Sequence, residues 1–197
     1  MSLKLPNKTA GSLYILSGPS GVGKTTLRRA LLKKISGLRF SVSWTTRARR
    51  PGEKAGKDYR FVSKKAFKEK KEARAFLEWA RVHQEYYGTP RSPIEGWIAK
   101  GEDVILDIDI QGARQVKKRI RQAVTIFVLP PSTRELKNRL VKRETEPAAE
   151  LVLRLKNAEK EMQSWRAFDF VVVNKEIRTS VAALEAIIRA GRFRVRG

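Results

Sequence analysis

The chain has 197 residues, of which 41% are hydrophobic, so it is long enough for one domain with a substantial core. It has no cysteine and no run of about eighteen apolar residues, and its first ten residues do not form a secretory signal; we therefore expect a cytoplasmic protein without disulfides, thiolate metal sites or a membrane span. A net charge of +23 favours polyanionic ligands, a class that includes both nucleotides and nucleic acids.

The first predicted elements are a buried strand at Leu13–Ser17 and a helix over about 24–35. The segment between them, Gly18-Pro19-Ser20-Gly21-Val22-Gly23-Lys24-Thr25, matches the phosphate-binding pattern G-x-x-x-x-G-K-[ST]. Its glycines allow backbone N–H groups to surround an anion, Lys24 can reach the β- and γ-phosphates, and Thr25 can bind Mg²⁺. The motif predicts a nucleotide phosphate at a helix N-terminus.

Short apolar runs and helix-period segments alternate through most of the chain. Nearly continuous apolar strands indicate a parallel sheet that is buried on both faces, as in α/β folds. The further predicted strands are Phe40–Ser43, Asp103–Asp109, Val124–Leu129 and Phe170–Val173, and the further helices are about 92–100, 111–119, 133–142, 148–164 and 179–190. Ser132 and Glu135 predict an N-terminal cap, and Leu151, Leu155, Ala158, Met162 and Trp165 predict a core-facing stripe.

Two segments depart from this pattern. From Trp44 to Pro93 the chain is rich in charge, glycine and tyrosine, and its strand-like pieces are short, which predicts an inserted lobe that closes on a ligand. The second, 139–154, is a candidate mobile element that contains Arg139, Arg143 and Arg154.

Asp107 and Asp109 follow a buried strand, at the sheet edge where doubly wound folds bind ligands. Residues two apart on a strand share a face, so both carboxylates could hold Mg²⁺ through water or accept a ligand donor. Alternatively, Asp109 caps the following helix, which leaves Asp107 free for function.

The inserted segment contains candidates for binding a phosphate and a base. Arginines and hydroxyls in Ser43–Glu53 can grip a phosphate, and Tyr59 and Tyr86-Tyr87-Gly88-Thr89 add neutral donors. Glu78 has apolar neighbours and therefore needs partners, which the adjacent N–H donors of guanine could supply. We expect His83, the only histidine, to be a surface or packing residue.

Taken together, these motifs resemble the guanylate kinase family over about residues 13–190. The ordered matches are the phosphate loop, S-x-T-T-R-x-x-R-x-G-E, G-x-D-Y-x-F-V, F-x-E-W-A, Y-Y-G-T and L-D-I-D-x-Q-G. The resemblance implies one P-loop kinase domain over 1–197, with a core of 11–43, 94–132 and 165–190, a GMP-binding lobe at about 44–93 and a helical lid at about 133–164. It also implies the reaction of ATP with GMP to give ADP and GDP, with Mg²⁺.

The family's residue roles carry over by position. Arg47, Arg50, Tyr59 and Tyr87 would hold the GMP phosphate, and Ser43, Glu78, Thr89 and Asp109 would read or orient the guanine. The ATP site would comprise Gly18, Pro19, Ser20, Gly21, Val22, Gly23, Lys24, Thr25, Thr26 and Asn174, with Thr25 and Asp107 near the metal. The resemblance assigns phosphoryl transfer to Lys24, Arg139, Arg143 and Arg154.

The sequence also departs from the family pattern at Arg49, Glu144, Pro147-Ala148-Ala149 and Lys175, which concerns the lid and the adenine contacts rather than the GMP residues. Three alternatives remain open. They are a kinase of another phosphorylated acceptor, a non-catalytic binding module, which would be expected to lack Lys24, and a nucleic-acid-binding protein that uses its charge and the basic tail Arg189–Arg196. The sequence does not distinguish a monomer from a homo-oligomer.

Overall fold

A computed structural model describes residues 10–82, 84–141 and 148–194. Its central element is a five-stranded sheet in the order β2-β7-β1-β8-β9, and each neighbouring pair in it is parallel. The strands are β1 (Leu13–Ser17), β2 (Leu38–Phe40), β7 (Asp103–Asp107), β8 (Val124–Leu129) and β9 (Phe170–Val173). The predicted α/β fold with a mostly parallel sheet is confirmed.

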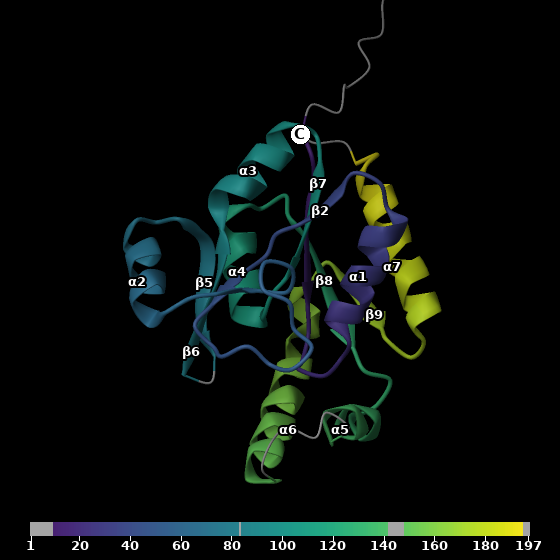
Figure 1. Ribbon diagram of the computed structural model, residues 1–197. Coiled ribbons are helices and arrows are strands. Elements are labelled where there is room, and N and C mark those ends of the chain that lie inside the picture. The colour runs from purple at the N-terminus through teal and green to yellow at the C-terminus, as the bar shows by residue number, and fades with distance from the viewer. Residues whose placement is uncertain (1–9, 83, 142–147, 195–197) are drawn as a thin grey trace, which may run out of the picture.

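Helices cover both faces of this sheet (Figure 1). Tyr14 and Leu16 pack toward α1 (Lys24–Lys34) and α7 (Ile177–Gly191), whereas Leu13 and Ile15 pack toward α3 (Arg91–Ala99) and α4 (Ile110–Arg119). This alternation buries β1 on both sides, which is why its sequence is apolar throughout. Among the helices of the described ranges, none has the length and hydropathy to span a membrane.

A second sheet of four strands, in the order β4-β3-β6-β5, lies beside α4 (Figure 1). It comprises β3 (Trp44–Thr45), β4 (Arg60–Phe61), β5 (Phe76–Val82) and β6 (Glu85–Pro90), with α2 (Lys64–Glu72) packed against it. The expectation of short strand pieces holds for β3 and β4, but β5 and β6 are longer and form an antiparallel hairpin. The helix α2 was not predicted; it buries Phe67, whose ring stacks on Phe76 at 4.6 Å.

Two further helices, α5 (Thr133–Val141) and α6 (Ala148–Met162), pack together through Leu136, Leu140 and Ala158. Ser132 caps α5, since its Oγ accepts a hydrogen bond from Glu135 N at 3.1 Å, as predicted. Trp165 does not continue the core stripe: α6 ends at Met162, a 3₁₀ helix η1 (Gln163–Ala167) follows, and Trp165 is 37% exposed. The side chain of Leu151 lies outside the described part.

Two strand boundaries differ from the prediction, and both differences concern the site. β2 spans Leu38–Phe40 rather than Phe40–Ser43, because after pairing with β7 the chain leaves the sheet toward the second sheet. β7 ends at Asp107, and Asp109 is the N-cap of α4, where its carboxylate accepts a hydrogen bond from Gly112 N. The capping alternative for Asp109 is therefore the one observed.

Candidate functional site

One cleft lies where the carboxyl ends of β1 and β7 face the second sheet. It brings together most of the predicted residues: Gly18, Ser20, Gly21, Gly23, Lys24, Thr25, Thr26, Ser43, Arg47, Arg50, Tyr59, Glu78, Tyr87, Asp107 and Asp109. Four further residues that had not been assigned a role also line this cleft: Glu53, Val82, Ile108 and Glu161. Motifs that are far apart in the sequence thus line a single cleft.

The phosphate loop owes its shape to backbone conformations that favour glycine. Gly18 has φ +142°, and a Cβ at this position would lie 2.3 Å from Val128 O. Gly23 precedes α1 with φ +100° and has no side chain with which to cap the helix. No side chain of the N-cap residue therefore accepts from the N–H groups in the first turn of α1. These groups remain available to bind an anion. Lys24 Nζ donates to Gly18 O at 2.6 Å and to Pro19 O at 3.1 Å.

Thr25 and Asp107 form the candidate metal position. Thr25 Oγ1 donates to Asp107 Oδ2 at 3.4 Å, which joins the first turn of α1 to the end of β7. In the described residues, no three or more His, Cys, Asp or Glu side chains form a cluster that could hold a metal ion. This pair fits Mg²⁺, which keeps several waters and uses one or two protein oxygens together with phosphate oxygens.

Glu78 on β5 is a buried carboxylate that lines the cleft. Its side chain is only 3% exposed, and its Oε1 accepts a hydrogen bond from Thr89 Oγ1 at 2.5 Å. Thr89 Oγ1 in turn lies 3.2 Å from Ser43 Oγ. Burial, aided by the nearby Asp109 and opposed by the Thr89 hydrogen bond, raises the pKa of Glu78 to about 7. Burial likewise raises the pKa of Asp109.

Arg47 is the centre of a group suited to a phosphate. Its Nε donates to Tyr87 OH at 3.2 Å, and its Nη2 pairs with Glu53 Oε1 at 2.7 Å. Tyr59 packs edge-on against Tyr87, with ring centroids 5.9 Å apart. Glu53 Oε2 also accepts from Arg50 N at 2.8 Å, so this carboxylate orients both arginine positions. Glu53 ends the R-x-x-R-x-G-E segment, and that spacing was the sequence signal for its role.

Among the described residues, five predicted site residues do not line the cleft: Pro19, Val22, Thr89, Arg139 and Asn174. The last two lie behind the phosphate loop. Arg139 donates to Val22 O at 3.3 Å and to Asn174 O at 3.2 Å, while its Nε pairs with Glu135. The buried Asn174 donates from Nδ2 to Val22 O at 2.8 Å. Both residues therefore brace the backbone of the loop. The side chain of Arg154 and the whole of Arg143 lie outside the described part, as do His83, Glu144 and Pro147.

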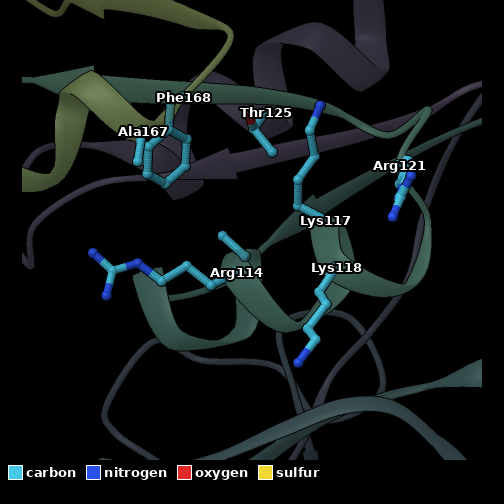
Figure 2. A pocket seen from close by; sticks show the side chains of 8 residues that line it. Arg114, Lys117, Lys118, Arg121, Thr125, Ala167 and Phe168 are labelled. Atoms are coloured by element: carbon cyan, nitrogen blue, oxygen red, sulfur yellow. The ribbon is translucent and has the colours of Figure 1, made fainter.

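A second, basic hollow lies between α4 and the chain that follows η1 (Figure 2). Lys117 Nζ pairs with Asp169 Oδ2 at 2.7 Å and donates to Ala123 O, so its charge is already satisfied. The heads of Arg114 and Lys118 point in different directions in Figure 2. These cations do not converge on one ligand, and the hollow shares no lining residue with the cleft.

Comparison with known proteins agrees with this geometry. The family model described as guanylate kinase matches residues 10–191. A guanylate kinase of Bartonella henselae is 46% identical over 191 residues, covering 96% of this chain and 86% of that protein. One from Thermotoga maritima is 45% identical over 185 residues, covering 94% of this chain and 89% of that protein.

Solved structures show the same relation. The crystal structure of a guanylate kinase from Anaplasma phagocytophilum superposes with a TM-score of 0.81 at 35% identity, covering 95% of this chain and 89% of that chain. A shikimate kinase from Bacteroides thetaiotaomicron, at 17% identity and a TM-score of 0.50, shares the fold alone; it covers 90% of this chain and 98% of its own. From the ordered motifs, the single cleft that unites them and these matches, the chain belongs to the guanylate kinase family.

Proposed function

We propose that this protein transfers the γ-phosphoryl group of ATP to GMP and forms ADP and GDP. The observation that carries the proposal is the cleft lined on one side by the phosphate loop and on the other by the group of Arg47, Tyr87 and Glu78. The relatives that match almost the whole chain are guanylate kinases, which supports the same activity.

The acceptor phosphate needs orientation rather than a general base. A nucleoside monophosphate has a second pKa of about 6, so its phosphate is mostly a dianion at neutral pH and is already nucleophilic. Arg47, Tyr59 and Tyr87 would hold its oxygens, with Arg50 beside them. Lys24 would stabilise the negative charge on the transferring phosphoryl group. Positioning and electrostatic stabilisation are the main sources of catalysis in phosphoryl transfer. The assignment of Arg139, Arg143 and Arg154 to the same group remains a prediction.

Glu78 would select guanine. Its buried carboxylate can accept the adjacent N1–H and N2–H₂ donors of guanine, while Thr89 and Ser43 fix its orientation. Adenine offers no such pair of donors, so binding AMP would leave a buried carboxylate unsatisfied, at a cost of roughly 1.5–3 kcal/mol. Asp109, at the start of α4, would complete this end of the site.

Thr25 and Asp107 would hold Mg²⁺, with Asp107 acting directly or through water. When bound, the ion neutralises charge on the nucleotide phosphates. The glycine-rich loop would bind the ATP phosphates. Asn174 supports that loop from behind through Val22, so its contribution to ATP binding would be indirect.

The second sheet, within 44–93, would act as the GMP-binding lobe, and the pair α5 and α6, within 133–164, as the lid. Glu161 on α6 lines the cleft, so the lid segment already reaches the site. Closure of both parts would exclude water and limit wasteful hydrolysis of ATP. A kinase of another acceptor would not need Glu78, and a non-catalytic module would not need Lys24 so close to the loop carbonyls.

A coupled assay for ADP, with GMP, dGMP, AMP, UMP and CMP offered in turn, tests the proposal. We expect rapid ADP formation with GMP and little with AMP or the pyrimidine nucleotides. Equal rates with GMP and AMP would contradict the role of Glu78. No activity with any of them would contradict the proposed function.

A further inference from the structure

We propose that Asp58, held by Arg28 and Arg29, is a positioning residue that fixes Tyr59 for the acceptor phosphate and couples the phosphate-loop helix to the GMP-binding lobe. The inference rests on the proposed function, because it names a residue that acts through the proposed GMP site. It concerns an ion-pair cluster outside the groups that contact either nucleotide in that proposal.

The cluster joins two separate parts of the fold. Asp58 Oδ1 accepts from Arg29 Nη2 at 2.5 Å and from Arg28 Nη2 at 3.3 Å, and both arginines lie on α1. Asp58 Oδ2 accepts from the backbone N–H of Lys54 at 3.0 Å. One carboxylate thus closes the turn 54–58 of the GMP-binding lobe and fastens it to the helix that begins with Lys24 and Thr25.

Burial makes the loss of this connection costly. Arg28 is 4% exposed and Asp58 is 6% exposed, and the guanidinium of Arg28 lies 3.7 Å above the ring centroid of Phe40. Although burial opposes ionisation, the hydrogen bond from Lys54 and the charge of Arg29 keep the pKa of Asp58 below its usual range. If Asp58 lost its charge, the buried guanidinium of Arg28 would lose one of its two acidic neighbours and keep only Asp107. Its Nε already has no hydrogen-bond partner within the described structure.

The turn leads directly to Tyr59. Asp58 N donates to Lys54 O at 2.9 Å, Gly56 N donates to Tyr59 O at 2.9 Å, and β4 then begins at Arg60. The Tyr59 ring contacts the Tyr87 ring, and Arg47 Cζ lies 5.6 Å from the Tyr59 centroid. Movement of the Asp58 turn would therefore shift a residue that belongs to the proposed acceptor-phosphate group.

Packing alone does not fix Tyr59. A cavity between α1 and the GMP-binding lobe is lined by Thr25, Arg28, Asp58 and Tyr59, so Tyr59 borders open space on this side as well as in the cleft. Without the ion pairs, the turn has room to move. The arginines stand one helical turn beyond Lys24 and Thr25, so the same helix presents groups to ATP and anchors the lobe that binds GMP.

Steady-state kinetics of Asp58→Asn tests this role. We expect KM for GMP to rise about tenfold or more, equivalent to about 1.4 kcal/mol, with KM for ATP and kcat at saturating GMP within about twofold of wild type. The matched control is Asp103→Asn. Asp103 is 1% exposed, pairs with Arg192 at 2.8 Å and accepts from Ser12 N, but it lies at the opposite end of β7 from the cleft. The Asp103→Asn substitution should lower the melting temperature without changing KM for GMP.

A second comparison tests the route through Tyr59. In a Tyr59→Phe background, Asp58→Asn should add less than about twofold to KM for GMP, since residues that act as a unit are non-additive. If Asp58→Asn does not fold, the exposed arm of the cluster can be cut instead: Arg29→Ala should raise KM for GMP about threefold, while Arg39→Ala, in another exposed pair, should leave it unchanged.

The outcomes separate the inference from the proposed function. An inactive wild-type enzyme overturns both. An active wild type whose KM for GMP is unaffected by Asp58→Asn and Arg29→Ala, or is raised equally by Asp103→Asn, overturns the inference alone. Effects of Asp58→Asn and Tyr59→Phe that simply multiply overturn the route through Tyr59.

Discussion

The two ends of the cleft are built in different ways. The phosphate loop relies on backbone: glycines with positive φ, the N-terminus of α1 and one lysine, all within eight consecutive residues from Gly18 to Thr25. The proposed GMP end relies on side chains from separate elements, among them Arg47 after β3, Glu78 on β5 and Asp109 at the start of α4. A continuous segment forms the first, whereas the second exists only after folding.

This difference predicts different sensitivities. At the loop, a new Cβ meets the backbone, as at Gly18, where Val128 O would lie 2.3 Å away. At the GMP end, loss of one polar group leaves its buried partners unsatisfied, as would happen around Glu78. Substitutions in the loop should therefore lower catalysis with every acceptor, whereas substitutions at the proposed GMP end should change which acceptor is used.

The largest effect should come from Lys24→Met. The substitution removes the positive charge of the loop but keeps roughly the length of the side chain, so kcat should fall by about 10³-fold, as is typical when a charge that stabilises phosphoryl transfer is lost. KM for GMP should stay within about twofold of wild type. Initial-rate kinetics with both substrates varied provides the measurement. A comparable loss of GMP affinity would mean that the two ends are not separable.

Glu78→Gln should have the next largest effect and should act on one substrate. The amide keeps an acceptor for Thr89 but places an N–H₂ group against the guanine donors. We therefore expect kcat/KM for GMP to fall between about tenfold and 100-fold, with KM for ATP unchanged. Separate titrations of GMP and ATP distinguish the two, and equal losses for both substrates would count against the assignment of Glu78.

Gly112→Ala gives a more local test of the GMP end. A Cβ on Gly112 would lie 2.6 Å from Glu78 Oε2, so the added methyl group should displace the carboxylate and raise KM for GMP about tenfold, with ATP affinity unchanged. Gly96→Ala is the control. Gly96 lies within α3 and its Cβ would meet no atom within 4 Å, so alanine there should leave KM unchanged and stabilise the fold slightly.

The pH dependence of GMP binding should show a smaller effect. With a pKa of about 7, Glu78 gains its charge as the pH rises through neutrality, so KM for GMP should fall about fourfold between pH 6.5 and 8. Since the GMP phosphate also titrates in this region, Glu78→Gln is the reference. The fall should be weaker in that variant, and identical pH profiles would show that Glu78 does not titrate there.

A last effect, on the free energy of unfolding rather than on kinetics, should appear in the protein without nucleotides. The folded protein holds a proton on Glu78 up to about pH 7, whereas the unfolded chain releases it near the ordinary value of 4.5. This contribution to stability is therefore full at low pH and is lost as the pH rises toward 7, by at most about 1.4 kcal/mol per unit. Denaturant unfolding should show Glu78→Gln gaining on wild type between pH 5 and 8. A constant difference would contradict this.

The sequence predicted much of this molecule because local physics determines those parts. The apolar run of β1 and the glycine pattern of the loop specify both the strand and the anion site. It did not predict α2, whose charged sequence buries only Phe67, or the exposure of Trp165. The roles given to Asn174 and Arg139 at the nucleotide stay predictions, and the sequence did not foresee that both side chains donate to Val22 O of the loop. Such bracing contacts join residues more than a hundred positions apart and leave no local pattern.

The two hydrogen bonds from Lys24 Nζ to Gly18 O and Pro19 O also affect the entropy that is lost when the loop binds a phosphate. A free lysine side chain samples many rotamers, and restricting it takes up to about 2 kcal/mol of entropy. Here the backbone carbonyls of Gly18 and Pro19 already restrain the ammonium group beside the loop. An incoming phosphate therefore exchanges hydrogen bonds with a preorganised cation and does not have to recruit one from solvent.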